Sequence, residues 1–93
     1  NVALEQLYIY DNHLTAIDIS TNTALDVIDV SDNDLPEAQV DALLAAVVAA
    51  GHSPTINNYI DLMNYGAGTN AAPSGAGLAN ITILEGLGWN VYH

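Results

Sequence analysis

The sequence predicts an α/β solenoid, in which short parallel strands form a sheet on the concave side, two helices lie on the convex side and a last strand caps the C-terminal end. Three observations predict this fold. One spacing of aliphatic residues recurs head to tail through residues 4–35. Two later stretches, 36–51 and 75–85, have apolar residues at helical spacing, and a short apolar segment, 88–92, follows the second.

The recurring unit has an aliphatic residue at its first, fourth and sixth positions and an asparagine at its ninth. Its three copies run from Leu4 to Asn12, from Leu14 to Asn22 and from Leu25 to Asn33. An offset of 21 residues also aligns identical residues, namely Leu4 with Leu25, Asp11 with Asp32, Asn12 with Asn33 and Leu14 with Leu35. Such regularity at a fixed period is the signature of a repeat architecture.

Strand geometry explains the spacing. Alternate side chains of a strand point to opposite faces, so Leu7 and Ile28 are predicted to face inward while Tyr8 and Asp29 face outward. One coil of chain cannot cover its own apolar stripe, and stacking the coils buries it, at about 1.5–3 kcal/mol for each fully buried aliphatic side chain. The asparagine that ends each strand is predicted to turn inward, where its amide satisfies backbone groups at the bend. Asn12 and Asn33 are predicted to form a ladder.

The first predicted helix follows Leu35. Its buried stripe comprises Val40, Leu43, Leu44 and Val47. Asp34 suits the N-cap region, Pro36 suits the first turn, and Gly51 is a C-terminal stop signal. The second repeat is therefore expected to return through a helix.

The last third of the chain predicts one more coil. Ile60 and Leu62 form an inward strand pair with Asp61 outward, and a Gly-rich loop at 66–74 follows. The second helix is predicted over 75–85 with one apolar side, formed by Leu78, Ile81 and Leu84. A terminal strand should then close the core through Trp89 and Val91.

Together the repeats resemble the leucine-rich repeat family, in its short bacterial and phage form of about 21 residues. Residues 68–91, "GTNAAPSGAGLANITILEGLGWNV", resemble the closing segment of such domains in bacterial surface proteins and phage virion proteins. The resemblance implies a single domain over 1–93, with repeats at 4–24, 25–55 and 56–86, a cap strand at 87–93, and a larger protein around it. Residues 51–59 lack the usual leucine, so the register of the third coil stays open.

Composition limits the partners. The chain has eleven carboxylates, no Lys or Arg and a formal net charge of −11, so it repels phosphate backbones and anionic headgroups. Nucleic acid and membrane insertion are therefore not expected, and no apolar run approaches the roughly 18 residues of a spanning helix. There is no cysteine for a disulfide or a thiolate metal site.

Aspartates are concentrated in residues 26–34, which raises calcium as an alternative. An EF-hand loop needs Gly at its sixth position and Glu at its twelfth, but counting from Asp29 gives Asp34 and Val40. Turn positions also favour Asp, because its side chain accepts from nearby backbone N–H groups. We expect a solvated acidic face with no dedicated metal and no cofactor; loose binding of divalent ions stays open.

The candidate binding face is the outward side of the predicted strands. Its residues are Tyr8, Tyr10, Asp29, Ser31, Asp61, Met63 and Tyr92. We expect one column of Tyr8, Asp29, Asp61 and Asn90 beside another of Tyr10, Ser31, Met63 and Tyr92. Tyrosines with adjacent carboxylates suit the recognition of protein or sugar, although tyrosine is also an ordinary strand former.

Catalysis is not expected. His13, His52 and His93 lack paired spacing for a metal, and no serine lies in a nucleophile-elbow motif. We therefore expect a structural or interaction module of an extracellular assembly, in a virion or on a bacterial surface, that contacts copies of itself or neighbouring proteins. The alternative is an adhesin domain that recognises a glycan or a host surface protein through its Tyr/Asp face.

Overall fold

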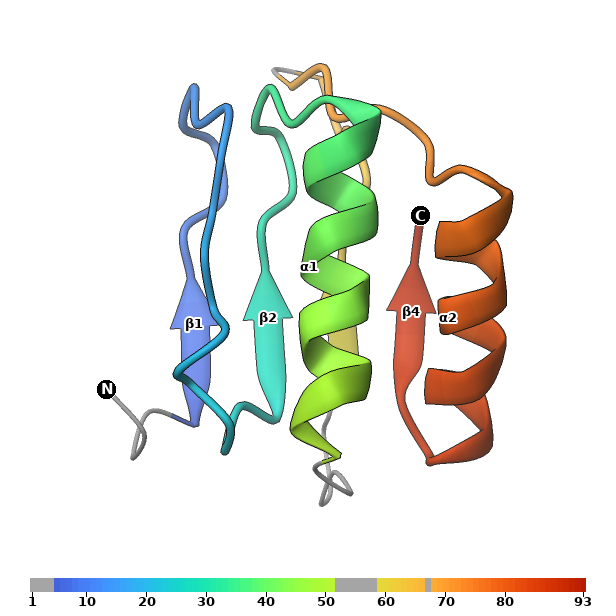
Figure 1. Ribbon diagram of the computed structural model, residues 1–93. Coiled ribbons are helices and arrows are strands. Elements are labelled where there is room, and N and C mark those ends of the chain that lie inside the picture. The colour runs from blue at the N-terminus through green and yellow to red at the C-terminus, as the bar shows by residue number, and fades with distance from the viewer. Residues whose placement is uncertain (1–4, 52–58, 67) are drawn as a thin grey trace.

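A computed structural model describes residues 5–51, 59–66 and 68–93. The elements within these ranges are, in chain order, β1 (Gln6–Tyr8), β2 (Val27–Asp29), α1 (Glu37–Ala50), β3 (Tyr59–Asp61), α2 (Gly75–Gly86) and β4 (Asn90–Tyr92). The strands form one parallel sheet in the order β1-β2-β3-β4, so each strand lies beside the next strand in the sequence. Figure 1 shows the strands pointing the same way, with the helices returning between them.

The sheet register places one inward residue of each strand at the same level. Leu7 pairs with Ile28, Ile28 with Ile60, and Ile60 with Val91. Ile28 and Ile60 are 0% exposed, whereas Leu7 and Val91 on the edge strands are partly buried against the same core. The predicted parallel sheet and its inward row are confirmed.

The chain between β1 and β2 returns without a helix in the described structure. Figure 1 shows this segment running back beside the strands. Ile19 and Leu25 belong to the buried core, and Ile17 packs against it. The middle copy of the sequence pattern, residues 14–22, therefore forms a return segment. Its Ile17 and Ile19 contribute to the core, whereas its Leu14 is 37% exposed.

Helix α1 covers the sheet with the predicted stripe. Its buried residues are Val40, Leu43, Leu44 and Val47. The helix ends at Gly51, whose positive φ of 64° suits glycine and lets its N–H donate to the carbonyl of Val48. The expected capping by Asp34 is wrong: Pro36 is the N-cap, and the Asp34 carboxylate bonds to Thr69 and His13 instead.

Helix α2 is tied to α1 at its first turn. Ser74 is its N-cap, and the Asp41 carboxylate on α1 accepts hydrogen bonds from both the N–H and the hydroxyl of Ser74. Gly77 lies against Asp41, where a β-carbon would collide with the Asp41 side chain. Gly77, Ile81 and Leu84 therefore form the buried side of α2.

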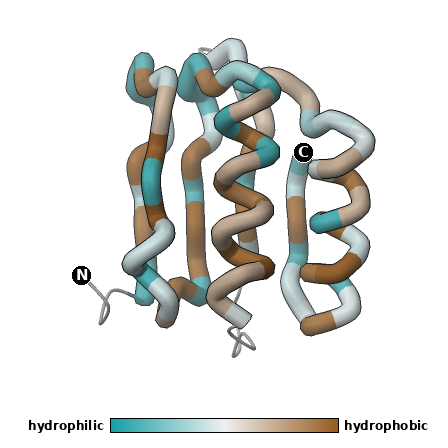
Figure 2. Tube along the Cα trace, in the orientation of Figure 1, coloured by the Kyte–Doolittle hydropathy of each residue, from teal (hydrophilic) through white to brown (hydrophobic). Residues whose placement is uncertain are grey.

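The prediction that Leu78 lies on the buried side of α2 is wrong. Leu78 is 47% exposed, whereas Ile81 and Leu84 are buried as predicted. Gly77, four residues before Ile81, takes the contact with Asp41 on α1 and completes the buried side in place of Leu78. Trp89 is buried in the core and Val91 packs against it, as predicted for the closing segment. Figure 2 shows hydrophobic residues on β2, β4 and both helices, and hydrophilic turns after β1 and β2.

Candidate functional site

The face of the sheet opposite the core carries a row that crosses all four strands. The register aligns Tyr8 with Asp29, Asp29 with Asp61, and Asp61 with Tyr92. The predicted columns were wrong for β4, because Asn90 aligns with Tyr59 and Tyr92 takes the place expected for Asn90. The buried Trp89 precedes the strand, so Val91 is the inward residue opposite Ile60.

A second row continues past the strand ends. Asp11 donates through its N–H to the carbonyl of Ser31, and Asp32 donates to the carbonyl of Met63, each at 3.0 Å. These bonds keep Tyr10, Ser31 and Met63 side by side. Met63 and Tyr10 are exposed as predicted, but Ser31 is buried, so it contributes little surface to this face.

The carboxylates of Asp29 and Asp61 have structural partners. The Asp29 Oδ1 accepts from the N–H of Ser31 at 3.1 Å and from its hydroxyl at 2.6 Å. The Asp61 Oδ1 accepts from the N–H of Met63 at 3.0 Å, and its Oδ2 accepts from the Tyr65 hydroxyl at 2.8 Å. Asp61 is only 8% exposed, so the expectation of solvated outward carboxylates is wrong at this position. These side chains fix the turn after each strand.

The exposed part of the face is aromatic. Its tyrosines, between 49% and 64% exposed, are Tyr8, Tyr10, Tyr65 and Tyr92. Tyr59 lies beside them, and its ring meets that of Tyr92 edge to face with centroids 6.1 Å apart. This arrangement offers rings and hydroxyls to a partner while the carboxylates stay behind them.

Sequence reasoning missed Tyr59 and Tyr65. Tyr59 stands two residues before Asp61, so strand alternation alone could have placed it on the outward face. Tyr65 had no such signal, because its contact with Asp61 depends on the course of the loop after β3.

Two of these hydroxyls are held neutral. Burial, followed by the neighbouring Tyr8 and Asp29, raises the pKa of Tyr59 to about 12. The hydrogen bond to Asp61 is the main cause that raises the pKa of Tyr65 above its usual value of 10.0. Both phenols therefore keep their protons, and act as hydrogen-bond donors, to a higher pH than an ordinary tyrosine.

The turns after the strands hold the acidic residues together. Asp32 Oδ1 accepts from the N–H groups of Tyr65 at 2.7 Å and Gly68 at 3.0 Å. Asp34 accepts from the Thr69 hydroxyl at 2.7 Å and contacts His13 Nδ1 at 3.2 Å. The Thr69 bond is the main cause that lowers the pKa of Asp34, and His13 adds to it. Asp29, Asp32 and Asp34 thus anchor the backbone and the loops that follow the strands.

Within the described ranges no group of three or more His, Cys, Asp or Glu could hold a metal ion. His13 and His93 lie in different parts of this structure, at a turn and beside β4, while His52 falls outside the described residues. Neither described helix has the length and apolarity needed to cross a membrane.

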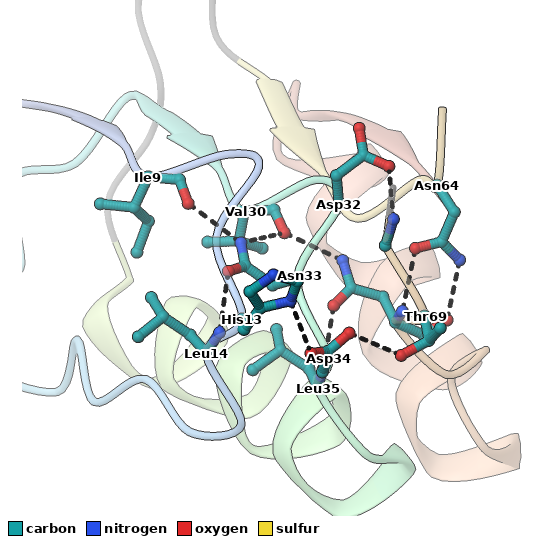
Figure 3. Close-up of polar contacts among 12 residues, drawn as sticks. Ile9, His13, Leu14, Val30, Asp32, Asn33, Asp34, Leu35, Asn64 and Thr69 are labelled. Atoms are coloured by element: carbon teal, nitrogen blue, oxygen red, sulfur yellow. Dashed lines mark hydrogen bonds and ion pairs between the residues drawn. The ribbon is translucent and has the colours of Figure 1, made fainter. Parts of the chain in front are cut away.

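An asparagine ladder lies at the same end of the sheet (Figure 3). Asn33 is fully buried, and its Nδ2 donates to the carbonyls of Ile9 and Val30, each at 3.0 Å. Its Oδ1 accepts from the N–H of Leu14 at 3.1 Å. Asn12 is exposed, and among the described residues its amide donates to carbonyls of its own turn, those of Ile9 and Tyr10.

The ladder has a further member that sequence reasoning placed in a loop. Asn70 donates to the carbonyls of Val30 at 2.9 Å and Leu62 at 3.2 Å, and it accepts from the N–H of Leu35 at 3.0 Å. Asn64 holds the Asn70 backbone from both sides. The ladder therefore extends through three levels of the described chain.

Beyond Asn70 the structure is hollowed. A cavity of about 300 Å³ is lined by Leu62, Met63, Asn64, Asn70, Ala71, Ala72, Pro73 and His93. It lies at the carboxyl ends of the strands, next to the tyrosine face through Met63. Searches among protein-family models, curated proteins and solved structures find no match to this chain.

Proposed function

We propose that this chain is a solenoid of the short leucine-rich-repeat type and that it acts as a non-enzymatic interaction module. The equivalent roles of Asn33 and Asn70 support the solenoid, since each bonds to the backbone of the turn before it. Asp11 and Asp32, one period apart, also share a positive φ, of 58° and 54°. Repeated sequence and repeated backbone geometry thus agree.

The observation that carries the function is the row of exposed tyrosines on the sheet face opposite the core. No described element covers that face, and it displays Tyr8, Tyr10, Tyr65 and Tyr92 with Met63 beside them. Tyrosine and methionine are both enriched where proteins bind proteins. Tyrosine in particular buries a large rigid ring at low entropic cost. A polypeptide partner, another copy or a neighbouring chain, is the occupant that this surface suits best.

Charge suggests the character of that partner. The chain carries a net charge of −11 without any Lys or Arg, so long-range electrostatics attract a basic surface and repel an acidic one. A neighbouring basic chain is therefore favoured over another copy of this chain. Arginine could stack on the tyrosine rings. We place the complex in an extracellular assembly, at a cell surface or in a virion, as the family resemblance implies.

A glycan is the alternative ligand. Sugar recognition by this face would use Asp29 and Asp61 to accept hydroxyl protons, yet both carboxylates already accept bonds from Ser31, Met63 and Tyr65. The rings remain free to stack on a sugar, but fewer oxygens remain to orient it. We therefore favour a polypeptide.

The test uses two libraries. A displayed random-peptide library is selected on the immobilised chain, and a glycan array is incubated with the labelled chain. We expect enriched peptides that carry Lys or Arg and that lose binding at least tenfold to the variant Tyr8→Ala/Tyr10→Ala. Raising the salt concentration from 50 to 500 mM should also weaken the binding of these peptides, because salt screens their attraction to the acidic chain. Light scattering measures whether copies of the chain associate.

The matched control is Leu78→Ala/Ile83→Ala, which removes comparably exposed apolar side chains from α2. It should leave the peptide binding unchanged. Binding that survives the tyrosine variant but not the α2 variant would overturn the assignment to the sheet face. Enrichment of sugars without peptides would favour the glycan instead.

A further inference from the structure

The asparagine ladder repeats one backbone arrangement at two successive levels. At the first, Asn33 accepts from the N–H of Leu14 and donates to the carbonyl of Ile9. At the second, Asn70 accepts from the N–H of Leu35 and donates to the carbonyl of Val30. Leu14 lies two positions after Asn12, and Leu35 lies two positions after Asn33. The N–H that each asparagine oxygen accepts therefore follows the preceding asparagine of the ladder by two positions.

The same rule identifies a donor and an acceptor at a third level. The residue two positions after Asn70 is Ala72, and the carbonyl equivalent to those of Ile9 and Val30 is that of Leu62. The Leu62 carbonyl accepts from its own asparagine, Asn70, at 3.2 Å, as the Val30 carbonyl accepts from Asn33. The Val30 carbonyl takes a second amide from the next level, whereas the Leu62 carbonyl takes none among the described residues.

Ala72 completes the comparison. Its N–H has no hydrogen-bond partner within residues 5–51, 59–66 and 68–93, although the N–H groups of Leu14 and Leu35 each have an asparagine oxygen. Ala72 and Leu62 both line the cavity of about 300 Å³ that lies beyond Asn70. Two residues that line the cavity thus carry an unused donor, on the exposed Ala72, and an acceptor with spare capacity, on Leu62. Their counterparts Leu14 with Ile9, and Leu35 with Val30, each hold a side-chain amide.

We propose that this cavity binds a primary carboxamide, supplied by an asparagine side chain of a polypeptide partner. The amide oxygen accepts from the Ala72 N–H, and the amide nitrogen donates to the Leu62 carbonyl. An aspartate carboxylate of the same shape cannot donate a hydrogen bond to the Leu62 carbonyl. It is also repelled by the net charge of −11 on the chain. This site does not depend on the tyrosine face, although Met63 borders both.

Amide-resolved NMR of the ¹⁵N-labelled chain tests the site. The probes are N-acetyl-asparagine N-methylamide and its aspartate counterpart at pH 7, with acetamide as a third ligand. We expect the asparagine probe to shift the Ala72 amide proton downfield in a saturable way, in the millimolar range for so small a ligand. The aspartate probe should leave this signal unchanged.

Equal shifts from both probes, or an Ala72 signal that does not respond to the asparagine probe, would overturn the proposal. A response to acetamide alone would overturn the assignment to an asparagine side chain. The variant Ala72→Pro removes the donor, so binding to it is followed through the amide signals of Met63 and Ala71, which also line the cavity. We expect this variant to bind the asparagine probe about tenfold more weakly, as for one lost hydrogen bond. If that variant does not fold, Ala72→Leu narrows the cavity and should weaken binding too, whereas Ala79→Leu on the exposed surface of α2 should not.

Discussion

Asn33 and Asn70 play the same structural part in consecutive levels of the molecule, although far more residues separate them than the 21 between Asn12 and Asn33. Each amide donates to a carbonyl of the preceding level, at 3.0 Å for Asn33 to Ile9 and 2.9 Å for Asn70 to Val30. Each also accepts from a backbone N–H of that level. These side chains therefore replace the hydrogen bonds that the backbone gives up where it turns.

Replacing Asn33 should be costly. Asn33→Ala leaves the Leu14 N–H without its acceptor and removes the amide donor from the carbonyls of Ile9 and Val30 inside the protein. We expect the free energy of unfolding to fall by about 2–4 kcal/mol, measured by urea denaturation. Asn12→Ala is the matched control, since Asn12 is exposed and should cost about 1 kcal/mol or less. Similar losses for the two variants would contradict the buried ladder.

A second prediction concerns two glycines. Gly68 lies against the backbone of Asp32, so a β-carbon there would overlap main-chain atoms that cannot rotate away. Gly86 ends α2 with open space around its Cα. Gly68→Ala should lower the melting temperature, whereas Gly86→Ala should raise the stability by up to about 1 kcal/mol through helix propensity. A Gly68→Ala protein as stable as the parent would show that the loop is not packed on Asp32.

The sequence was sufficient for the elements whose signals are local. The aliphatic spacing placed Ile28 and Ile60 in the core row, and the stripe at Val40, Leu43, Leu44 and Val47 predicted α1 with its Gly51 stop. Burial of such side chains depends only on strand alternation or helical periodicity. These predictions are confirmed.

Features set by contacts between distant segments could not be predicted. Asn70 follows a longer turn after β3, so the period of the repeat no longer indicated its role. Asp61 is covered by Tyr65, and Gly77 forms the contact of α2 with Asp41 while Leu78 is exposed. The tyrosine face was predicted from alternation, but which of its polar groups remain free depended on loops without periodic spacing.

Alkaline titration should show a late ionisation of Tyr59. Its pKa is raised to about 12, chiefly by burial, so the folded chain keeps this phenol neutral when unfolded tyrosine ionises near pH 10. The stabilisation is complete below pH 10 and is lost as the pH rises toward 12. In a Tyr65→Phe background, which removes the other phenol of raised pKa, absorbance at 295 nm should show a late ionisation that Tyr59→Phe abolishes and Tyr10→Phe retains. Loss of the late step in Tyr10→Phe would contradict the assignment.

The next prediction concerns the pKa of Asp34, which is hydrogen-bonded to Thr69. The Thr69 hydroxyl donates to the Asp34 carboxylate at 2.7 Å and lowers the pKa of Asp34 below 3.8 more than His13 does. Thr69→Val removes that donor, so the pKa of Asp34 should rise, as followed by the ¹³C shift of its carboxyl carbon. His13→Ala should raise it less, because the imidazole is the smaller cause.

The same pair gives the sign of a stability change. A lowered pKa in the folded state means that the carboxylate stabilises the fold above the unfolded pKa, and that this contribution disappears as the pH falls through the folded pKa. Thr69→Val should therefore melt at a lower temperature than the parent at pH 7, and the difference should shrink as the pH falls below about 3.8. A constant difference down to pH 2 would mean that Thr69 acts through packing, because protonation of Asp34 would then leave its contribution intact.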